Sequence, residues 1–311
     1  MLIKKCLWFD SIQNLVVHTN GSVTTLDNEF LGQIDGARRC YKVNEREVLI
    51  LDDRNQPYLL SLSAGTIESL GTFRVSDVYG ELLLTYTRSS PRVYGVFSMD
   101  TRSFIYETEN YLGECIRQAF IVAIDNTAVS FRELATGKSI FSVTTNEQIS
   151  DFLMLDKDRL LLAKMDGELQ LFDIPTNRQI DCYFDTGVIR GLHLDTNMER
   201  VYGLNHHSFV EIDTKNGALI RNASVVPHLA SFPKRVLSIT HSLLRSGSLL
   251  LIADFRYLGI FSPIDLSTDL ILEIPFGDKN SFIPIPGDCF QASRNGVFVL
   301  DDAGTLYRLD S

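Results

Sequence analysis

Residues 149–184 read ISDFLMLDKDRLLLAKMDGELQLFDIPTNRQIDCYF. Apolar and polar residues alternate here in short runs, which is the period of a half-buried β-strand. The pair Asp166-Gly167 separates two of these runs. It is a strong signal for a two-residue β-hairpin, since it supplies the positive φ angles of a type I′ turn. We therefore predict an antiparallel sheet with strands at 149–155, 159–164, 168–173 and 180–183.

The same unit recurs along the chain. Its next copy has predicted strands at 188–194, 200–204, 209–212 and 218–221. Looser copies contribute one hairpin each: 15–18 with 22–26, 48–51 with 58–62, 82–86 with 93–99, 121–124 with 128–131, 249–253 with 259–261, and 297–300 with 305–309. No stretch keeps a 3.6-residue period beyond two turns, so the sequence predicts an all-β protein.

A polar position closes the third strand of every unit, and it is acidic in seven of eight cases: Asp27, Ser63, Asp100, Glu133, Asp173, Asp213, Asp265 and Asp310. The spacing runs from 33 residues (Asp100 to Glu133) to 52 (Asp213 to Asp265). A strand-only repeat of this length is typical of a β-propeller, in which neighbouring sheets cover both apolar faces of each blade. We predict one propeller domain over residues 1–311, with four-stranded blades. Eight blades fit the count best, and seven are the alternative.

The last hairpin, 297–309, leaves the eighth blade without a fourth strand. Residues 2–9 form an apolar strand that either fills this place or serves as the first strand of the first blade. The sequence does not decide between these two arrangements.

Two segments, RVYG at 200–203 and FVEIDTKNG at 209–217, resemble a blade of the YVTN type. By its repeat, the chain as a whole resembles the broad superfamily of WD-repeat, YVTN and PQQ-type propellers. No Trp-Asp dipeptide ends a third strand, and Trp8 is the only tryptophan. The resemblance therefore implies a fold and carries over no functional residues.

The composition of the chain argues against several classes of function. The net charge of −10 argues against general nucleic-acid binding, which needs a basic surface. No apolar stretch approaches 18 residues, and polar residues such as Asp10 interrupt the start of the chain, so we expect no membrane span and no signal peptide. Five cysteines without a close pair indicate reduced thiols and a cytoplasmic protein. We expect no cofactor and no metal site.

The acidic positions have a structural interpretation. Asp173 and Asp213 each precede a short polar loop, whose backbone N–H groups an aspartate accepts readily. We predict this role for the repeated acids. A functional ring of carboxylates on one face is the alternative.

The predicted first strands carry a second recurrent feature, a basic residue near the start: Lys5, Arg39, Arg74, Arg117, Arg190 and Arg235. First strands line the channel of a propeller, so these cations are predicted to converge at its mouth and bind an anion, such as phosphate, sulfate or an acidic peptide tail. The alternative is that each pairs with an acid or carbonyl of the neighbouring blade.

Taken together, these patterns favour a non-catalytic propeller scaffold that binds a protein partner, with a small anionic ligand as a further candidate. The alternative function is an enzyme that acts on a small anionic substrate at the channel mouth. Such an enzyme needs convergent carboxylates or histidines beside the basic residues.

Overall fold

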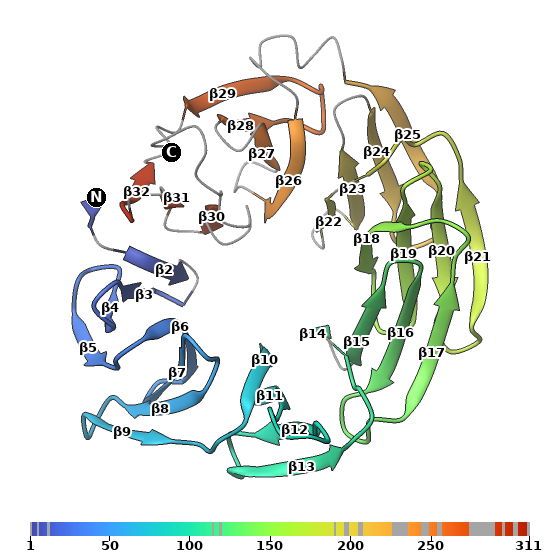
Figure 1. Ribbon diagram of the computed structural model, residues 1–311. Coiled ribbons are helices and arrows are strands. Elements are labelled where there is room, and N and C mark those ends of the chain that lie inside the picture. Colours follow the sequence, from blue (N-terminus) through green and yellow to red (C-terminus); the bar gives the residue numbers. More distant parts are fainter. Residues whose placement is uncertain are drawn as a thin grey trace. The chain divides into compact units, whose positions relative to one another are not determined.

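The computed structural model of the 311-residue chain describes residues 2–4, 6–10, 13–113, 115–117, 120–189, 191–195, 199–204, 208–225, 236–243, 249–253, 257–273, 290–293, 296–300 and 304–309. Every regular element in these ranges is a β-strand, as the sequence predicts. The strands form eight four-stranded sheets, numbered here in chain order (Figure 1). Where registers are described, neighbouring strands pair antiparallel.

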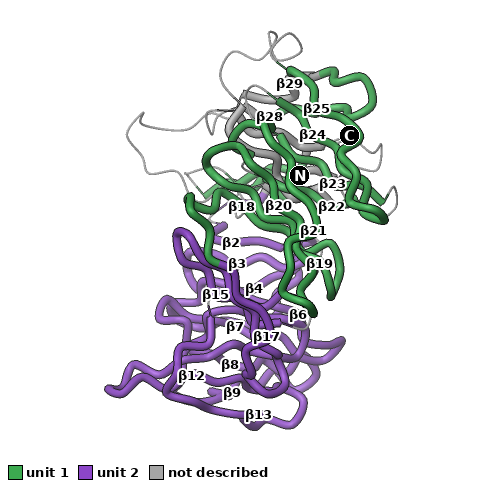
Figure 2. Tube along the Cα trace, turned by 90° about the vertical axis from the view of Figure 1, so that its right-hand side faces the viewer, with its two compact units in different colours: residues 1–2, 144–311 green, residues 3–143 purple. Residues whose placement is uncertain are grey.

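The sheets divide between two compact units, which Figure 2 colours separately. The N-terminal unit, Ile3–Val143, carries sheets 1 to 4. Sheet 1 has β2 (Cys6–Asp10), β3 (Leu15–His18), β4 (Ser22–Thr25) and β5 (Phe30–Gln33); sheet 2 has β6 (Ala37–Asn44), β7 (Glu47–Asp52), β8 (Pro57–Ser61) and β9 (Thr66–Ser69). Sheet 3 has β10 (Arg74–Tyr79), β11 (Leu82–Tyr86), β12 (Tyr94–Ser98) and β13 (Ser103–Thr108); sheet 4 has β14 (Cys115–Arg117), β15 (Phe120–Asp125), β16 (Ala128–Glu133) and β17 (Ser139–Thr144).

The C-terminal unit, Met1–Leu2 with Thr144–Ser311, carries sheets 5 to 8. Sheet 5 has β18 (Ile149–Met154), β19 (Arg159–Lys164), β20 (Leu169–Asp173) and β21 (Arg178–Tyr183); sheet 6 has β22 (Leu192–Asp195), β23 (Arg200–Leu204), β24 (Ser208–Asp213) and β25 (Leu219–Ser224). Sheet 7 has β26 (Val236–Leu243), β27 (Leu249–Ala253), β28 (Tyr257–Phe261) and β29 (Thr268–Glu273); sheet 8 has β30 (Phe290–Ser293), β31 (Gly296–Leu300), β32 (Leu306–Leu309) and β1 (Leu2–Ile3). The single-domain organisation over residues 1–311 stays a prediction.

Sheet 8 resolves the question that the sequence left open for residues 2–9. The strand β1 pairs beside β32 and supplies the fourth strand of sheet 8, whereas β2 begins sheet 1. The segment is thus divided between two sheets, and each of the two predicted arrangements holds for one part of it.

Within each unit, apolar side chains between consecutive sheets form a core. Between sheets 5 and 6, Leu161, Leu169 and Leu171 pack with Val201 and Val210, all at most 1% exposed. Both sheets contribute because alternate residues of each strand point to opposite faces. Each fully buried Leu or Val contributes roughly 1.5–3 kcal/mol to the stability of the fold. Packing of one sheet against the next therefore stabilises sheets that are too small to fold alone.

The hairpin at Asp166-Gly167 differs from the prediction of a two-residue type I′ turn. Only Gly167 has a positive φ, 88°. The N–H of Lys164 donates to the carbonyl of Glu168 across a three-residue loop, and the N–H of Gly167 donates back to the carbonyl of Lys164. This is a turn followed by a left-handed glycine, a common three-residue hairpin. The dipeptide signalled a hairpin correctly but not its length.

Candidate functional site

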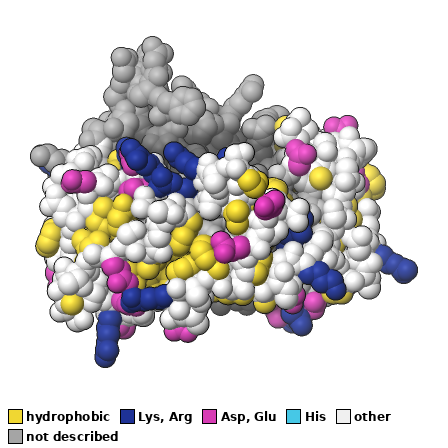
Figure 3. Space-filling view, turned by 60° about the horizontal axis from the view of Figure 1, so that its bottom comes forward, with side chains coloured by type: hydrophobic (Ala, Val, Ile, Leu, Met, Phe, Trp, Pro, Cys, Tyr) yellow, Lys and Arg dark blue, Asp and Glu magenta, His cyan; other side chains and the backbone are white. Residues whose placement is uncertain are grey.

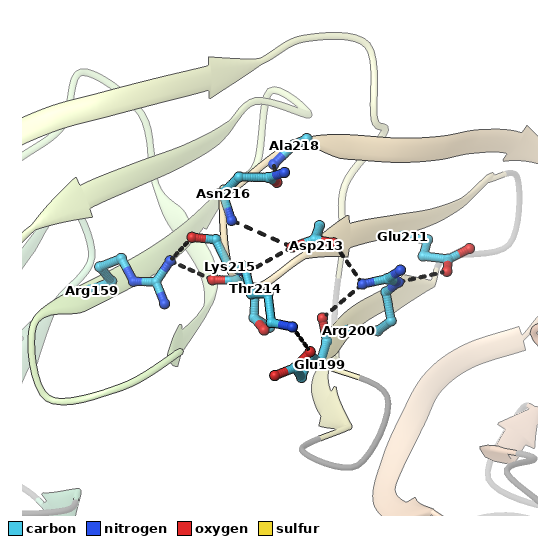
Figure 4. Close-up of polar contacts among 9 residues, drawn as sticks. All are labelled: Arg159, Glu199, Arg200, Glu211, Asp213, Thr214, Lys215, Asn216 and Ala218. Carbon is cyan, nitrogen blue, oxygen red and sulfur yellow. Dashed lines mark hydrogen bonds and ion pairs between the residues drawn. The ribbon is translucent and has the colours of Figure 1, made fainter.

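Asp213, at the end of β24, lies at the centre of a polar network (Figure 4). Its Oδ1 accepts the backbone N–H of Lys215 at 2.8 Å and that of Asn216 at 3.4 Å. Its Oδ2 accepts a hydrogen bond from Arg200 at 2.7 Å. The backbone bond from Lys215 is the main reason that the pKa of Asp213 lies below its usual value. The predicted role as an acceptor for loop N–H groups is confirmed here.

Two further acids of the repeat have the same role. Thr176 donates its N–H to Asp173 at 2.8 Å, and Ser267 donates its N–H to Asp265 at 3.1 Å. Hydrogen bonds from Ser262 and Ser267 lower the pKa of Asp265 to about 2. In the described contacts Asp100 has no such bond. Three of the seven repeat positions in the described residues, Asp173, Asp213 and Asp265, therefore hold a loop N–H group in this way.

The network around Asp213 also joins two sheets. Arg159 of sheet 5 donates to the backbone carbonyls of Thr214 and Lys215 in the turn of sheet 6, the latter at 3.2 Å (Figure 4). Its guanidinium also binds the carboxylate of Asp156, with Nε at 2.8 Å from Oδ2. These donors and acceptors satisfy one another, so the arrangement holds the turn in place and leaves little binding capacity for a ligand.

The basic residues predicted to form an anion site are described only in part. Lys5, Arg190 and Arg235 lie outside the described residues. Of the rest, Arg39 pairs in register with Leu51 and Arg74 with Tyr86, each toward the start of its first strand. Arg117 is instead the last residue of β14 and pairs with Phe120, the first residue of β15. The assignment of all six to one strand position was therefore wrong for Arg117.

The contacts of Arg117 and Arg74 run to neighbouring residues or sheets. Arg117 Nη1 donates to the carbonyl of Ile116 at 2.8 Å and lies 3.5 Å from the Asp77 carboxylate of sheet 3. Arg74 Nη1 donates to the Gln56 side chain of sheet 2 at 3.3 Å. Both arrangements fit the alternative in which such residues pair with the adjoining blade. Anion binding by the set stays a prediction.

A hydrogen bond between the first strands of neighbouring sheets occurs in both units and was not predicted from the sequence. Asp77 Oδ2 of β10 accepts the backbone N–H of Ile116 in β14 at 2.6 Å. In the other unit, Asp151 Oδ2 of β18 accepts the N–H of Leu192 in β22 at 2.7 Å. Both aspartates follow a register shift in their own strand, which turns the side chain toward the next sheet. These aspartates could be recognised only once the strand register was known.

A buried lysine is a second unforeseen feature. Lys164, 1% exposed, pairs with the carboxylates of Glu168 and, at 3.3 Å, Asp166. It also donates to the Asn146 side chain at 3.0 Å, and the Cys182 thiol donates to Glu168. Burial and this carboxylate raise the pKa of Cys182 to about 12. A thiol with so high a pKa is a poor nucleophile at neutral pH, so the cluster is a satisfied ion pair rather than a catalytic centre.

An open cleft of about 330 Å³ lies between sheets 1 and 2. Its lining combines apolar and polar side chains: Gln13, Asn14, Leu15, Thr25, Glu29, Phe30, Leu31, Lys42, Glu45, Val48 and Leu62. Phe30, at its rim, is 63% exposed. A large exposed aromatic beside a cleft is typical of a contact surface. No sequence pattern indicated this site, because its residues come from seven separate segments.

Two further observations hold for the described part of the chain. No group of three or more His, Cys, Asp or Glu side chains in them is arranged to hold a metal ion. None of their elements is a helix long and apolar enough to cross a membrane.

No protein-family model and no curated protein matches this chain in sequence. Solved structures do match it. Saccharomyces cerevisiae Sqt1 is similar with a TM-score of 0.62 at 8% identity, over 100% of this chain and 98% of that one. The WD40 β-propeller domain of Doa1 is similar with a TM-score of 0.51 at 14% identity, over 87% and 91%. The fold is a β-propeller. A chain from the Mitotic Checkpoint Complex also matches, with a TM-score of 0.52 at 10% identity over 85% and 84%.

These likenesses confirm the predicted fold and assign no specific family. The four-stranded sheets are of the kind that forms the blades of a propeller, which explains the strand-only repeat, and a count of seven or eight blades is compatible with the likenesses. At identities this low the similarity concerns the fold alone, because unrelated functions are built on one propeller scaffold.

Proposed function

We propose that this propeller is a non-catalytic protein-interaction scaffold of the cytoplasm. The observation that supports it most directly is the exposure of aliphatic side chains on fourth strands in both units. Ile105 of β13 is 45% exposed, Ile180 of β21 is 51% exposed and Ile220 of β25 is 46% exposed. On the face drawn in Figure 3, hydrophobic side chains reach the surface between charged ones. Apolar groups rimmed by charge are typical of protein contact surfaces.

One of the similar structures is that of a complex, the Mitotic Checkpoint Complex. That assembly belongs to the other protein, but it illustrates that a fold of this kind takes part in protein assembly. A rigid set of blades that displays many edges and loops suits the same use here.

The test identifies proteins cross-linked to the chain in its native host and repeats binding with the purified partner. Ile180→Arg and Ile105→Arg are compared with Gln179→Arg, an exposed neighbour on the same edge strand as Ile180. A partner that binds with 1:1 or other fixed stoichiometry supports the proposal, and loss of affinity in the isoleucine variants alone places the contact on the fourth strands. Failure to recover any stoichiometric partner contradicts the scaffold function.

The predicted anion site is a finer part of the proposal. Arg39 is exposed on β6 and Arg74 is partly buried on β10. Calorimetric titration with phosphate, sulfate and an acidic octapeptide should give binding that weakens with salt and is lost in the Arg39→Glu and Arg74→Glu variants. Turnover of a phosphorylated compound in the same samples would instead support the enzyme alternative. Binding unchanged in both variants would refute the site.

A further inference from the structure

The cleft between sheets 1 and 2 is the open end of a hydrophobic core. Leu15 and Val48 are 3% and 1% exposed, and both belong to the core that these sheets share. Leu31 and Leu62 pack against that core and also line the cleft. An apolar side chain that entered the cleft would therefore contact an existing core and lose part of its contact with water.

The backbone around the cleft is held in place by polar contacts. Gln13 Oε1 accepts the N–H of Lys42 at 2.6 Å, which ties the β2–β3 turn to β6. Asn14 Oδ1 accepts the N–H of Leu26 at 3.2 Å, and Thr25 Oγ1 accepts the N–H of Glu29 at 3.1 Å. The cleft is thus bounded by turns of sheet 1 that hydrogen bonds hold in place, one of them bonded to β6 of sheet 2, and a preformed site costs a ligand less ordering.

The charges at the rim have an excess of carboxylate. The Lys42 ammonium pairs with Glu45 at 2.8 Å, and the Glu45 side chain is 90% exposed. Glu29 is exposed, and no described contact engages its carboxylate. Exposed Asp27 lies two residues before Glu29. Exposed Arg46, next to Glu45, offsets Asp27. In the lining itself Glu29 and Glu45 face the single Lys42, and on a chain of net charge −10 this excess of one carboxylate gives the rim a negative potential that favours a basic ligand.

We propose that this cleft binds an extended peptide segment of a partner protein, in which one bulky apolar side chain enters the cleft and adjacent Lys or Arg residues face Glu29 and Glu45. The inference deepens the proposed scaffold function and rests on it. The volume of about 330 Å³ is at the lower end of the range for ligand pockets and suits one large side chain with its flanking backbone. An apolar anchor that packs into a cleft with charged groups around it is a usual form of a binding hot spot.

The experiment uses the full chain and a fluorescein-labelled ten-residue peptide in which a Leu-Phe pair lies between two pairs of arginines. One control peptide replaces the Leu-Phe pair by alanines, and another replaces the arginines by glutamates. Fluorescence anisotropy should show binding of the first peptide at least tenfold tighter than of either control. The alanine peptide tests the contact of the apolar anchor with the cleft, and the glutamate peptide tests the contact of the basic residues with the rim.

Protein variants locate the binding. Leu31→Trp fills the cleft, and Glu29→Lys reverses a rim charge. Glu109→Lys changes the net charge equally at an exposed position after β13 of sheet 3 and is the matched control. We expect at least a tenfold loss for the first two and less than a twofold change for Glu109→Lys. Since Glu29 and Glu109 are both exposed, their variants fold even if Leu31→Trp does not.

Equal weakening by Glu29→Lys and Glu109→Lys would mean attraction by net charge alone and would overturn the proposal. Tighter binding of the glutamate peptide, or of the alanine peptide, would do the same. A cross-linked partner that binds the Leu31→Trp protein normally would refute the cleft as the site while leaving the scaffold function intact.

Discussion

Lys164 and Glu168 show how this protein keeps a charge inside. An unpaired buried ammonium is very costly, so a buried lysine needs close acceptors. Here Glu168, Asp166 and Asn146 supply them. Burial raises the pKa of Glu168, but hydrogen bonds from Cys182, Lys164 and Gln170 outweigh that effect and lower the pKa to about 2.

Glu168→Gln should therefore lower the free energy of unfolding at pH 7 by about 1.5–3 kcal/mol, the scale of a hydrogen bond to a charged group. A carboxyl with a depressed pKa stabilises the fold above its unfolded pKa and loses that effect as the pH falls through its folded value. The difference between wild type and variant should thus shrink between about pH 4.5 and 2. Urea unfolding at several pH values measures this difference in the free energy of unfolding. Glu199→Gln, which removes an exposed partner of Lys215, should have a much smaller effect, and an equal effect would contradict the assignment.

The acidic repeat gives a second prediction at this scale. Replacing Asp173 or Asp213 by alanine removes acceptors of loop N–H groups, so both variants should melt at lower temperature than the wild type. Asp100→Ala is the matched control from the same repeat and should leave the melting temperature unchanged. Scanning calorimetry of the three variants decides. Three equal melting curves would show that the carboxylates are only solvated.

These residues also show which contacts could be predicted from the sequence and which could not. Acceptors such as Asp213 were predictable because donor and acceptor are two or three residues apart. The buried Lys164 was not, although Asp166 and Glu168 are close to it in the sequence, since its burial and its bond to Asn146, 18 residues away, depend on how the strands pack. Arg117 was misplaced because it was aligned by spacing alone, whereas its position depends on the pairing of a strand as short as β14.

Among the elements, the fourth strands carry a feature that no periodicity reveals. One residue is inserted relative to the third strand in β5, β13, β21, β25 and β29. The inserted residues are all aliphatic: Leu31, Ile105, Ile180, Ile220 and Ile271. In β9 the pairing is regular. A bulge disrupts the ladder and twists an edge strand, which discourages another chain from pairing there.

Deleting Ile180 should convert β21 into a regular edge strand, because Gln179 and Asp181 already pair with adjacent residues of β20. We expect the deletion variant to self-associate at concentrations where the wild type stays monodisperse. Sedimentation velocity measures this. Ile180→Ser keeps the bulge while removing the apolar group, so it should remain monodisperse. Association of the serine variant, or none of the deletion variant, would argue against edge protection.

Strand positions were largely predictable, and the bulges were not. The predicted strands 159–164 and 200–204 coincide with β19 and β23. Both are second strands with buried faces on either side, which gives strong apolar runs. A bulge cannot be read from the apolar pattern of one strand, because it depends on how two strands pair. The exposed fourth strands also have the weakest apolar alternation.

At the scale of the whole molecule, sheet 8 is distinctive because it draws on both ends of the described chain. Replacing Leu2 by proline removes an N–H group and restrains the backbone of β1, which lies beside β32. We expect faster amide hydrogen exchange in residues 306–309, with no change in sheet 3. Lys4→Pro is the control, because Lys4 lies just outside β1. Equal exchange in both variants would show that β1 contributes nothing to sheet 8.

The same pairing has a consequence for synthesis on the ribosome. Strands β1 and β32 are separated by roughly 300 residues, so at about 5–20 residues per second the first waits roughly 15–60 s for its neighbour to emerge. During that interval the sheets of the N-terminal unit have all their strands available, because they lie within one continuous segment. Among the sheets of the described residues, only sheet 8 combines strands from distant parts of the sequence, so in a nascent chain stalled before residue 306 the strand β1 would lack its neighbour β32.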